Sequence, residues 1–458
     1  MFIGREKELR RLEMMYDSNK FEFAIVYGRR RVGKTTLITQ FADKYKNIFF
    51  ACQKASNEDN LAELSKVISS YIGYNIVFSS FIEAFRAIIK LAENERLIFI
   101  LDEYPNLAEK DNNAISSIFQ NLIDHECRNT KLFLIISGSS LPFMKDDVLG
   151  KNSPLYGRST GIFRIQPFDY LSSAAFVPSY SYEDKTLVYG ITGGIPRYLE
   201  LFNDKHTIKE NLLYNLFDTN SVLFNERDNY LKEEFKEVST YNSILTAIAS
   251  GCTKLSEIAN RSGIQVGTLP KYLSKLKEVG IIERIVPMGE TEKKGVWQIS
   301  DLFFRFYFFF VQKNISTITS GRMEKYYDTL ITPLLNDYMG KVFEKIVNEY
   351  IETYAELPFP IETIGTWWGG SRKLKKEIEI DLIAASAISN QRILASVKYR
   401  NRKTPEAELG LMKDYASESG EGYEDIFWFF SKSGFEDDFH ESDNVKLFTL
   451  DDIYSIKR

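Results

Sequence analysis

The sequence has few residues of the kinds that build disulfide frameworks or histidine metal sites. Its 458 residues include three cysteines and three histidines. Cys52, Cys127 and Cys252 lie far apart and match neither a disulfide framework nor a zinc pattern, so we expect a reducing compartment, the cytoplasm. The small number of histidines argues against a histidine-based metal site.

The sequence also lacks a long apolar segment. Charged residues begin at Arg5, which leaves no apolar signal-peptide core. The conspicuous apolar run is residues 302–311 (LFFRFYFFFV), which contains Arg305 and is about half as long as the ~20 residues that a membrane span needs. We therefore expect no membrane association and a buried aromatic segment at this place.

The overall balance of charge is slightly acidic. The formal net charge is −5, with 44% hydrophobic and 26% charged residues, which is typical of a soluble globular protein. A net negative charge argues against non-specific coating of nucleic acid by the whole molecule but is compatible with a local basic face. At roughly 100–200 residues per domain, the length predicts three or four domains.

Short apolar runs alternate with helical stretches over the first third of the chain. The runs cover residues 23–27, 48–51, 97–101 and 132–137, and a last strand is expected at 160–168. Strands that alternate with helices predict an α/β fold, a parallel sheet with helices on both faces. We assign this core to residues 1–168.

One strand and one helix of this core flank the sequence GRRRVGKT, which fits the phosphate-loop pattern GxxxxGK[ST]. Glycines at both ends permit a backbone path whose N–H groups point at phosphate oxygens, the lysine reaches the β- and γ-phosphates, and the threonine hydroxyl binds Mg²⁺. A chance glycine-rich turn is the alternative, which the flanking strand and helix disfavour. The pattern predicts ATP and Mg²⁺ as cofactors, held by Gly28, Arg29, Arg30, Arg31, Val32, Gly33, Lys34, Thr35 and Thr36.

Two carboxylates end the buried strand 97–101. Ligands bind at the carboxyl ends of parallel strands, so Asp102 is expected to hold Mg²⁺ together with Thr35. Glu103 is expected to orient or deprotonate the attacking water. The alternative is an acidic turn without a function.

Two further residues are weaker candidates for catalysis. Ser137 ends the next strand in a Ser-Gly-Ser sequence and would sense the γ-phosphate, although such turns are common. Arg158 would supply an arginine finger, within one chain or between subunits that assemble, with an ordinary surface arginine as the alternative.

Several motifs together make residues 2–200 resemble the archaeal-type ATPase family of the AAA+/STAND group. They are the start Phe2–Glu6, the GRRRVGKT loop, the LDE strand end, the Ser-Gly-Ser strand end, the PLYGR segment and Gly193–Tyr198 (GGIPRY). In that family the N-terminal motif and the Gly-Gly-Ile-Pro turn flank the adenine. The resemblance therefore implies that Ile3, Gly4, Arg5 and Pro196 contact the nucleotide and that Arg197 senses the lid.

The middle of the chain predicts two smaller modules. Residues 169–237 are mostly helical and are broken by a Gly-Gly turn, as in a helical lid. Residues 238–311 follow the order helix, helix, turn, helix, β-hairpin of a winged helix-turn-helix. Its third helix carries Lys271, Lys275 and Lys277, and its loop carries Lys293 and Lys294. DNA contact and a protein-binding or spacer role are equally compatible with this pattern.

The last third predicts a linker at 312–335 and a second α/β domain at 336–458. This domain resembles the restriction-endonuclease-like PD-(D/E)XK fold often found in this ATPase family. The resemblance implies that Asp381, Lys398 and the helix residue Glu344 form a nuclease site. Ser396 stands where that pattern has a glutamate, and Glu379 is a candidate substitute.

A serine hydroxyl brings no charge to a Mg²⁺ site, so an inactive fold kept for binding or assembly is favoured over an active nuclease. Residues 398–403 hold four basic side chains suited to a nucleic-acid backbone or to a solvated strand end. Trp367 and Trp368 are interpreted as an exposed contact loop, with buried side chains as the commoner alternative.

The leading hypothesis is an ATP-driven switch, a slow Mg²⁺-dependent ATPase coupled to DNA or protein binding. The alternatives are an ATP-gated DNA nuclease and a DNA-binding regulator without catalysis.

Overall fold

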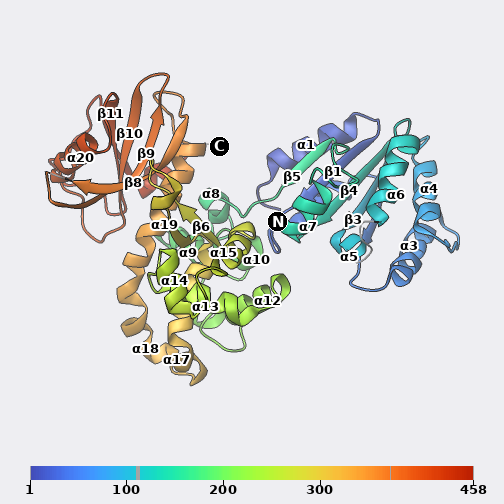
Figure 1. Cartoon of the computed structure of the whole chain (residues 1–458), viewed down its shortest axis with the longest axis horizontal. Helices are drawn as coiled ribbons and strands as arrows, with labels where there is room; N and C mark the ends of the chain where they lie inside the picture. The colour runs from blue at the N-terminus through green and yellow to red at the C-terminus, as the bar shows by residue number, and fades with distance from the viewer. Residues whose placement is uncertain (1, 110–113, 372, 457–458) are drawn as a thin grey trace. The chain divides into compact units, whose positions relative to one another are not determined.

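The computed structural model describes residues 2–109, 114–371 and 373–456, which form two compact units (Figure 1). Unit 1 contains the chain up to Pro167 together with Ile195–Arg197. Unit 2 contains Phe168–Gly194 and the chain from Tyr198 onward. The chain therefore passes between the units three times, and each unit is described by itself.

The centre of unit 1 is a sheet of five parallel strands in the order β2-β3-β4-β1-β5. Strands β1, β3 and β4 are buried over their whole length, because helices cover both faces. This arrangement confirms the parallel α/β sheet predicted from the apolar runs. The strands are β1 Glu22–Tyr27, β2 Asn47–Ala51, β3 Leu97–Asp102, β4 Leu132–Gly138 and β5 Gly161–Arg164.

Two hydrophobic cores lie on opposite faces of this sheet, since successive strand residues point to opposite sides. Ile25 and Phe99 face the core of α3 Asn57–Ile72, α4 Phe81–Leu91 and α6 Ala114–Leu122. Val26 and Ile100 face the core of α1 Glu6–Asp17 and α2 Lys34–Ala42. The remaining elements are α5 Pro105–Ala108, α7 Leu141–Phe143 and two π-helical turns at Ile123–Cys127 and Met144–Val148.

Unit 2 begins with the helices that were expected to form a lid. Their starts are fixed by Asp169, Ser181, Thr207 and Ser221, whose side chains each accept a hydrogen bond from a backbone N–H of the first turn. The helices are α8 Tyr170–Ala174, α9 Tyr182–Thr192, α11 Ile208–Asn215 and α12 Val222–Glu234, while the short helix α10 Pro196–Leu199 crosses the unit boundary.

The turn after α9 requires glycine. Gly194 has φ +70°, and a Cβ atom there would lie 1.9 Å from the carbonyl oxygen of Phe168. The backbone N–H of Phe168 also donates to the carbonyl oxygen of Gly194 at 2.7 Å. The two chain crossings at residues 167–168 and 194–195 are therefore tied together within unit 2.

Three helices and a hairpin follow, in the order expected for residues 238–300. They are α13 Val238–Ala249, α14 Leu255–Ser262 and α15 Leu269–Glu278, then the antiparallel strands β6 Ile282–Ile285 and β7 Val296–Ile299. The aromatic run continues as α16 Leu302–Phe306 and a π-helical turn Tyr307–Val311, and it is buried as predicted. Among the helices that the structure describes, none is long and apolar enough to cross a membrane.

Residues 312–335 are helical and packed. They form a 3₁₀ turn Gln312–Asn314, α17 Ile315–Thr319 and α18 Met323–Leu330, before α19 Thr332–Thr353 begins. Lys209 Nζ lies 2.7 Å from Asp328 Oδ2, which joins α11 to α18. The ring of Phe217 also meets that of Tyr327, so this stretch belongs to the packed body of unit 2.

The C-terminal part is a mixed sheet in the order β12-β11-β10-β9-β8, with antiparallel pairs β8/β9 and β9/β10 and parallel pairs β10/β11 and β11/β12. Ile380 packs toward Met412 of α20 on one face, and Glu379 meets Lys341 of α19 on the other. The elements are β8 Thr363–Ser371, β9 Lys376–Ser386, β10 Gln391–Lys398, α20 Ala407–Glu418, β11 Glu424–Ser431, β12 Val445–Thr449 and α21 Leu450–Tyr454.

The interpretation of Trp367 and Trp368 as an exposed contact loop is wrong. Both lie in strand β8, opposite Ile380 and Glu379 of β9, and both are half-buried. Tryptophan packs well on a pleated, half-buried surface, and the two glycines that follow it do not prevent pairing along an edge strand.

Buried tyrosines join the lid helices to the C-terminal domain. The hydroxyl of Tyr338 on α19 lies 2.7 Å from the carbonyl oxygen of Gly190 and 3.1 Å from that of Leu302. Tyr189 of α9 donates to Glu349 of α19 at 2.5 Å. Lid, aromatic segment and C-terminal sheet therefore form one body.

Replacing Tyr338 with phenylalanine tests this joint. Y338F leaves two buried carbonyl oxygens without their hydroxyl donor, which is expected to lower the free energy of unfolding of unit 2 by about 1–3 kcal/mol. Urea denaturation followed by circular dichroism measures the change. The matched control is Y326F, on the exposed face of α18, with an expected effect within about 0.5 kcal/mol. Equal losses in the two variants would contradict the joint.

Candidate nucleotide-binding site

The loop between β1 and α2 curls around the side chain of Lys34. The buried Lys34 Nζ donates to the carbonyl oxygens of Gly28 at 3.0 Å and Arg29 at 3.1 Å. Arg31 and Gly33 have left-handed backbones, with φ +70° and +88°. A Cβ atom at Gly28 would lie 2.2 Å from the carbonyl oxygen of Ile165, so only glycine fits there. The loop thus holds an ammonium group at the N-terminus of a helix, which suits a phosphate.

The predicted metal ligands lie side by side. Thr35 Oγ1, in the first turn of α2, donates to Oδ2 of Asp102, the last residue of β3, at 2.9 Å. Ser137 Oγ, at the end of β4, donates to Oδ1 of the same carboxylate. A hydroxyl and a carboxylate at this separation are oxygen ligands of the kind that Mg²⁺ prefers, so the pair fits the metal.

Glu103 follows Asp102 in a strained conformation. Its φ is +51°, in the left-handed region that non-glycine residues seldom adopt. Its Oε2 accepts hydrogen bonds from Ser139 Oγ at 2.8 Å and from the Ser139 backbone N–H at 3.3 Å. Its own N–H donates to Ser137 Oγ at 3.3 Å. The backbone turn aims the carboxylate at the end of β4.

Ser139 is a functional candidate that the sequence analysis missed. The sequence feature that could have pointed to Ser139 is the second hydroxyl of the Ser-Gly-Ser sequence. Only the pairing of β3 with β4, however, places this hydroxyl opposite Glu103. Ser137 lies at the site as expected; it is fully buried and holds Asp102.

The N-terminal motif lies against the loop. Arg5, with φ +68°, donates from Nη2 to the carbonyl oxygens of Val32 at 3.2 Å and Gln166 at 2.5 Å. Ile3 and Gly4 precede it and are half-buried. A Cβ atom at Gly33 would lie 3.9 Å from Pro196 Cγ. Both segments implied by the resemblance thus border the loop.

The other loop residues differ in exposure. Val32 packs into the core between the sheet and α2, so only its backbone is available to a ligand. Thr36 beside Thr35 is exposed. Arg29 is buried and Arg30 is half-buried.

Arg158 is engaged elsewhere. Its Nη2 lies 2.6 Å from Oδ2 of Asp124 and its Nη1 donates to the carbonyl oxygen of Pro154 at 2.9 Å. The hydrogen bonds from Arg158 hold the pKa of Asp124 below its ordinary value. In this conformation the guanidinium stabilises the turn after α7 and is not presented as a finger.

The proposed nuclease residues also converge, within unit 2. Asp381 Oδ2 accepts from the Val397 N–H at 2.7 Å and lies 3.3 Å from Lys398 Nζ. Glu344 of α19 lies close enough to Asp381 for the negative charges of the two carboxylates to repel each other. Burial raises the pKa of Glu344 to about 7; Lys341 lowers it, and Asp381 adds to the rise.

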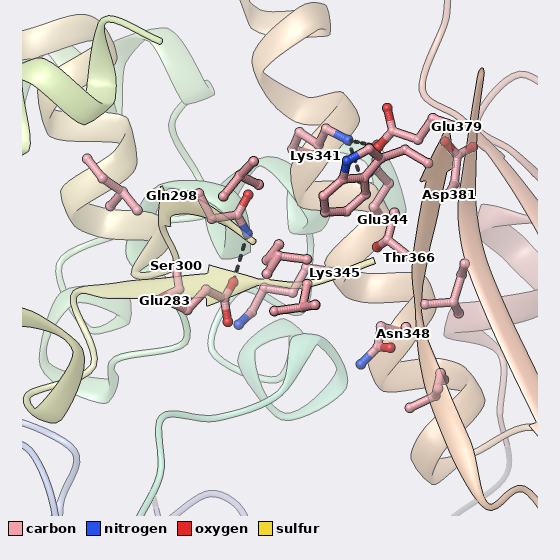
Figure 2. Close-up of a pocket in the computed structure, with 18 of the residues that line it drawn as sticks. Glu283, Gln298, Ser300, Lys341, Glu344, Lys345, Asn348, Thr366, Glu379 and Asp381 are labelled. Atoms are coloured by element: carbon pink, nitrogen blue, oxygen red, sulfur yellow. Dashed lines mark hydrogen bonds and ion pairs between the residues drawn. The ribbon is translucent and has the colours of Figure 1, made fainter. Parts of the chain in front are cut away.

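Lys341 is a second residue that the sequence analysis missed. Its Nζ lies 2.9 Å from Glu344 Oε2 and 3.0 Å from Glu379 Oε1 (Figure 2). Burial lowers the pKa of Lys341, but the charges and hydrogen bonds of the two carboxylates outweigh burial and raise it. The sequence feature that could have pointed to Lys341 is its position three residues before Glu344 on an amphipathic helix.

These side chains border a cleft of about 640 Å³ between the β6–β7 hairpin, α19 and the β8–β9 pair. Figure 2 shows Lys345 and Asn348 on α19 and Thr366 on β8 along the same cleft. Ser396, where the nuclease pattern has a glutamate, is buried, and its Oγ has no hydrogen-bond partner among the described residues.

Comparisons with known proteins agree with the geometry of unit 1. Residues 2–202 match a family described as an ATPase domain predominantly from Archaea, and residues 307–409 match a family of archaeal and bacterial proteins of unknown function. A solved structure, the Walker-type ATPase of Pyrococcus abyssi, has a TM-score of 0.51 at 22% identity and covers 67% of this chain and 96% of its own. That likeness shows the fold.

Two relatives come from Methanocaldococcus jannaschii. One, an uncharacterized ATP-binding protein, is 50% identical over 46 residues, which is 10% of this chain and 78% of that protein. The other, an uncharacterized protein, is 34% identical over 457 residues, which is 99% of this chain and 100% of the relative. The chain therefore belongs to the same family as this full-length relative, and in this chain the archaeal-type ATPase domain at 2–202 is followed by the second matched domain at 307–409.

Proposed function

We propose that the chain binds ATP with Mg²⁺ at the Gly28–Thr35 loop and hydrolyses it slowly. The observation that carries this proposal is the 2.9 Å hydrogen bond between Thr35 and Asp102, beside a buried Lys34 that reaches loop carbonyl oxygens. Lys34 binds the β- and γ-phosphates, Thr35 and Asp102 hold the metal, and the loop N–H groups cradle the phosphates. Bound Mg²⁺ neutralises phosphate charge.

Glu103 is the residue that orients the attacking water in this proposal. Its carboxylate is held by Ser139 in the conformation described, so it leaves that partner when it turns toward the γ-phosphate. Ser137 keeps Asp102 in place from the buried side. Arg158 is left out of the catalytic set, because Asp124 holds its guanidinium.

The first test removes the ammonium group. K34A loses the charge that faces the phosphates, so ATP binding is expected to disappear at micromolar nucleotide in isothermal titration calorimetry. The matched control is K46A, whose exposed ion pair with Glu95 contributes little. ATP binding by K34A with the affinity of the wild type would refute the site assignment.

The second test separates binding from hydrolysis. E103Q keeps the phosphate and metal ligands but cannot accept a proton, so phosphate release is expected to slow by about 10²-fold or more while ATP affinity stays within a few-fold. A phosphate-release assay and calorimetry measure the two effects. E58Q, on the exposed first turn of α3, is the control. Wild-type turnover in E103Q would exclude Glu103 as the residue that activates water.

We further propose that this ATPase is a switch. The support is the composition of unit 2, in which the lid helices are bonded to α16 and α19 through Tyr189 and Tyr338. Pro196 belongs to unit 1 and borders the loop, while Gly194, two residues earlier in the chain, belongs to unit 2. A nucleotide-dependent change at this crossing would carry the lid and the C-terminal domain as one piece.

A DNA partner is the coupling favoured for this switch. Residues 238–311 have the element order of a winged helix, and the helix α15 buries Leu269, Leu273 and Leu276 while its lysines, Lys271, Lys275 and Lys277, are exposed. Such a helix suits phosphate contacts in a major groove. Lys293 and Lys294 are exposed on the loop, although Lys294 lies 2.6 Å from Glu290. A DNA-binding regulator without catalysis remains the second candidate.

A further inference from the structure

The nuclease-like cleft of unit 2 is lined by a positively charged side chain, that of Lys341, close to its carboxylates. Lys341 and Glu344 are one turn apart on α19, and Glu379 faces them from β9 (Figure 2). The Lys341 ammonium lies 2.9 Å and 3.0 Å from these two carboxylates, as a shared counter-ion would. Asp381 is partnered separately, by the Val397 N–H and by Lys398.

The donors around this position do not fit a divalent metal. Mg²⁺ takes six oxygen ligands in near-octahedral geometry, whereas an ammonium group can only donate hydrogen bonds. Two of the three carboxylates already share Lys341. The fourth position of the nuclease pattern is the neutral Ser396, whose Oγ is buried without a hydrogen-bond partner in the described chain. Over residues 2–109, 114–371 and 373–456, no group of three or more His, Cys, Asp or Glu side chains could hold a metal ion.

We propose that Lys341 is a built-in counter-ion that takes the place of the divalent metal in this cleft, so that the cleft does not bind Mg²⁺. A metal that entered would have to displace an ammonium group that is covalently tethered to α19 and bonded to two carboxylates. The inference rests on the nuclease-like arrangement described above and is independent of the ATP site.

Charge around the cleft supports this role. Three carboxylates, Glu344, Glu379 and Asp381, have ammonium groups within reach, from Lys341 and Lys398. The charged side chains of Glu283, Arg305 and Lys345 line the rest of the cleft. Removing the Lys341 charge would leave Glu344 and Glu379 without the ammonium group that they share, an imbalance that a divalent cation can relieve. The same removal, with a carboxylate restored at Ser396, should therefore open the cleft to metal.

The experiment measures Mn²⁺ binding to the full-length chain without nucleotide, from the electron paramagnetic resonance signal of free Mn²⁺. K341A/S396E is expected to bind one more Mn²⁺ per chain than the wild type, and adding D381N should weaken that site by about tenfold or more. K341R/S396E is the matched control, because arginine keeps the positive charge, and it should gain no site. All variants share the same Gly28–Thr35 loop, so any metal bound there cancels.

Two results would overturn the proposal. One is a Mn²⁺ site in the wild type that D381N alone removes, because Lys341 would then not exclude metal. The other is a folded K341A/S396E chain that binds no more Mn²⁺ than K341R/S396E. Should the double variants fail to fold, K341M alone decides: Mn²⁺ should raise its Tm more than that of the wild type, and an equal shift refutes the proposal. ATP binding is unaffected by either outcome, so this test and that of the ATPase are separate.

Discussion

The parallel sheet of unit 1 imposes the constraint on which the nucleotide site depends. In a parallel sheet every strand ends at the same edge, so the residues after β1, β3 and β4 meet there although the sequence separates them widely. Lys34, Asp102 and Ser137 converge for this reason. A buried carboxylate such as that of Asp102 is tolerated only with hydrogen-bond partners, and Thr35 and Ser137 provide them.

The sequence predicts those parts of the site that are local. The GRRRVGKT loop and the two carboxylates at 102–103 carry their chemistry in consecutive residues, and the apolar runs around them predict the strands. Pairings between elements are not local. Ser139 meets Glu103 only because β4 lies beside β3, and Asp124 meets Arg158 only because a π-helical turn brings it there. Neither the order of strands in a sheet nor a π-helical turn can be recognised from the spacing of apolar residues along the sequence.

The lid shows the same limit at the level of domains. A helical stretch at 169–237 reads as a separate module, yet several of its polar side chains bond to residues more than a hundred positions away. Tyr170 donates to the carbonyl oxygen of Ile453, and Lys432 lies 2.7 Å from Glu183. Burial in this joint raises the pKa of Glu349 to about 6, with Lys345 and Tyr189 opposing the rise. Such contacts make these helices part of unit 2 and not a separate module.

The two acidic sites meet one electrostatic requirement in different ways. Carboxylates that are removed from water need positive charge or hydrogen-bond donors nearby. Around Asp102 the donors are hydroxyls, which can turn their oxygen toward an arriving metal and become or support its ligands. Around the largely buried Glu344, and for the exposed Glu379 beside it, the donor is an ammonium group, which has no lone pair to offer. At the first site the hydroxyl partners of Asp102 can therefore give way to a metal ion that arrives with the nucleotide. At the second site the positive charge belongs to the protein itself. Taken together, the two proposals place metal binding in unit 1 and a protein-borne positive charge in unit 2.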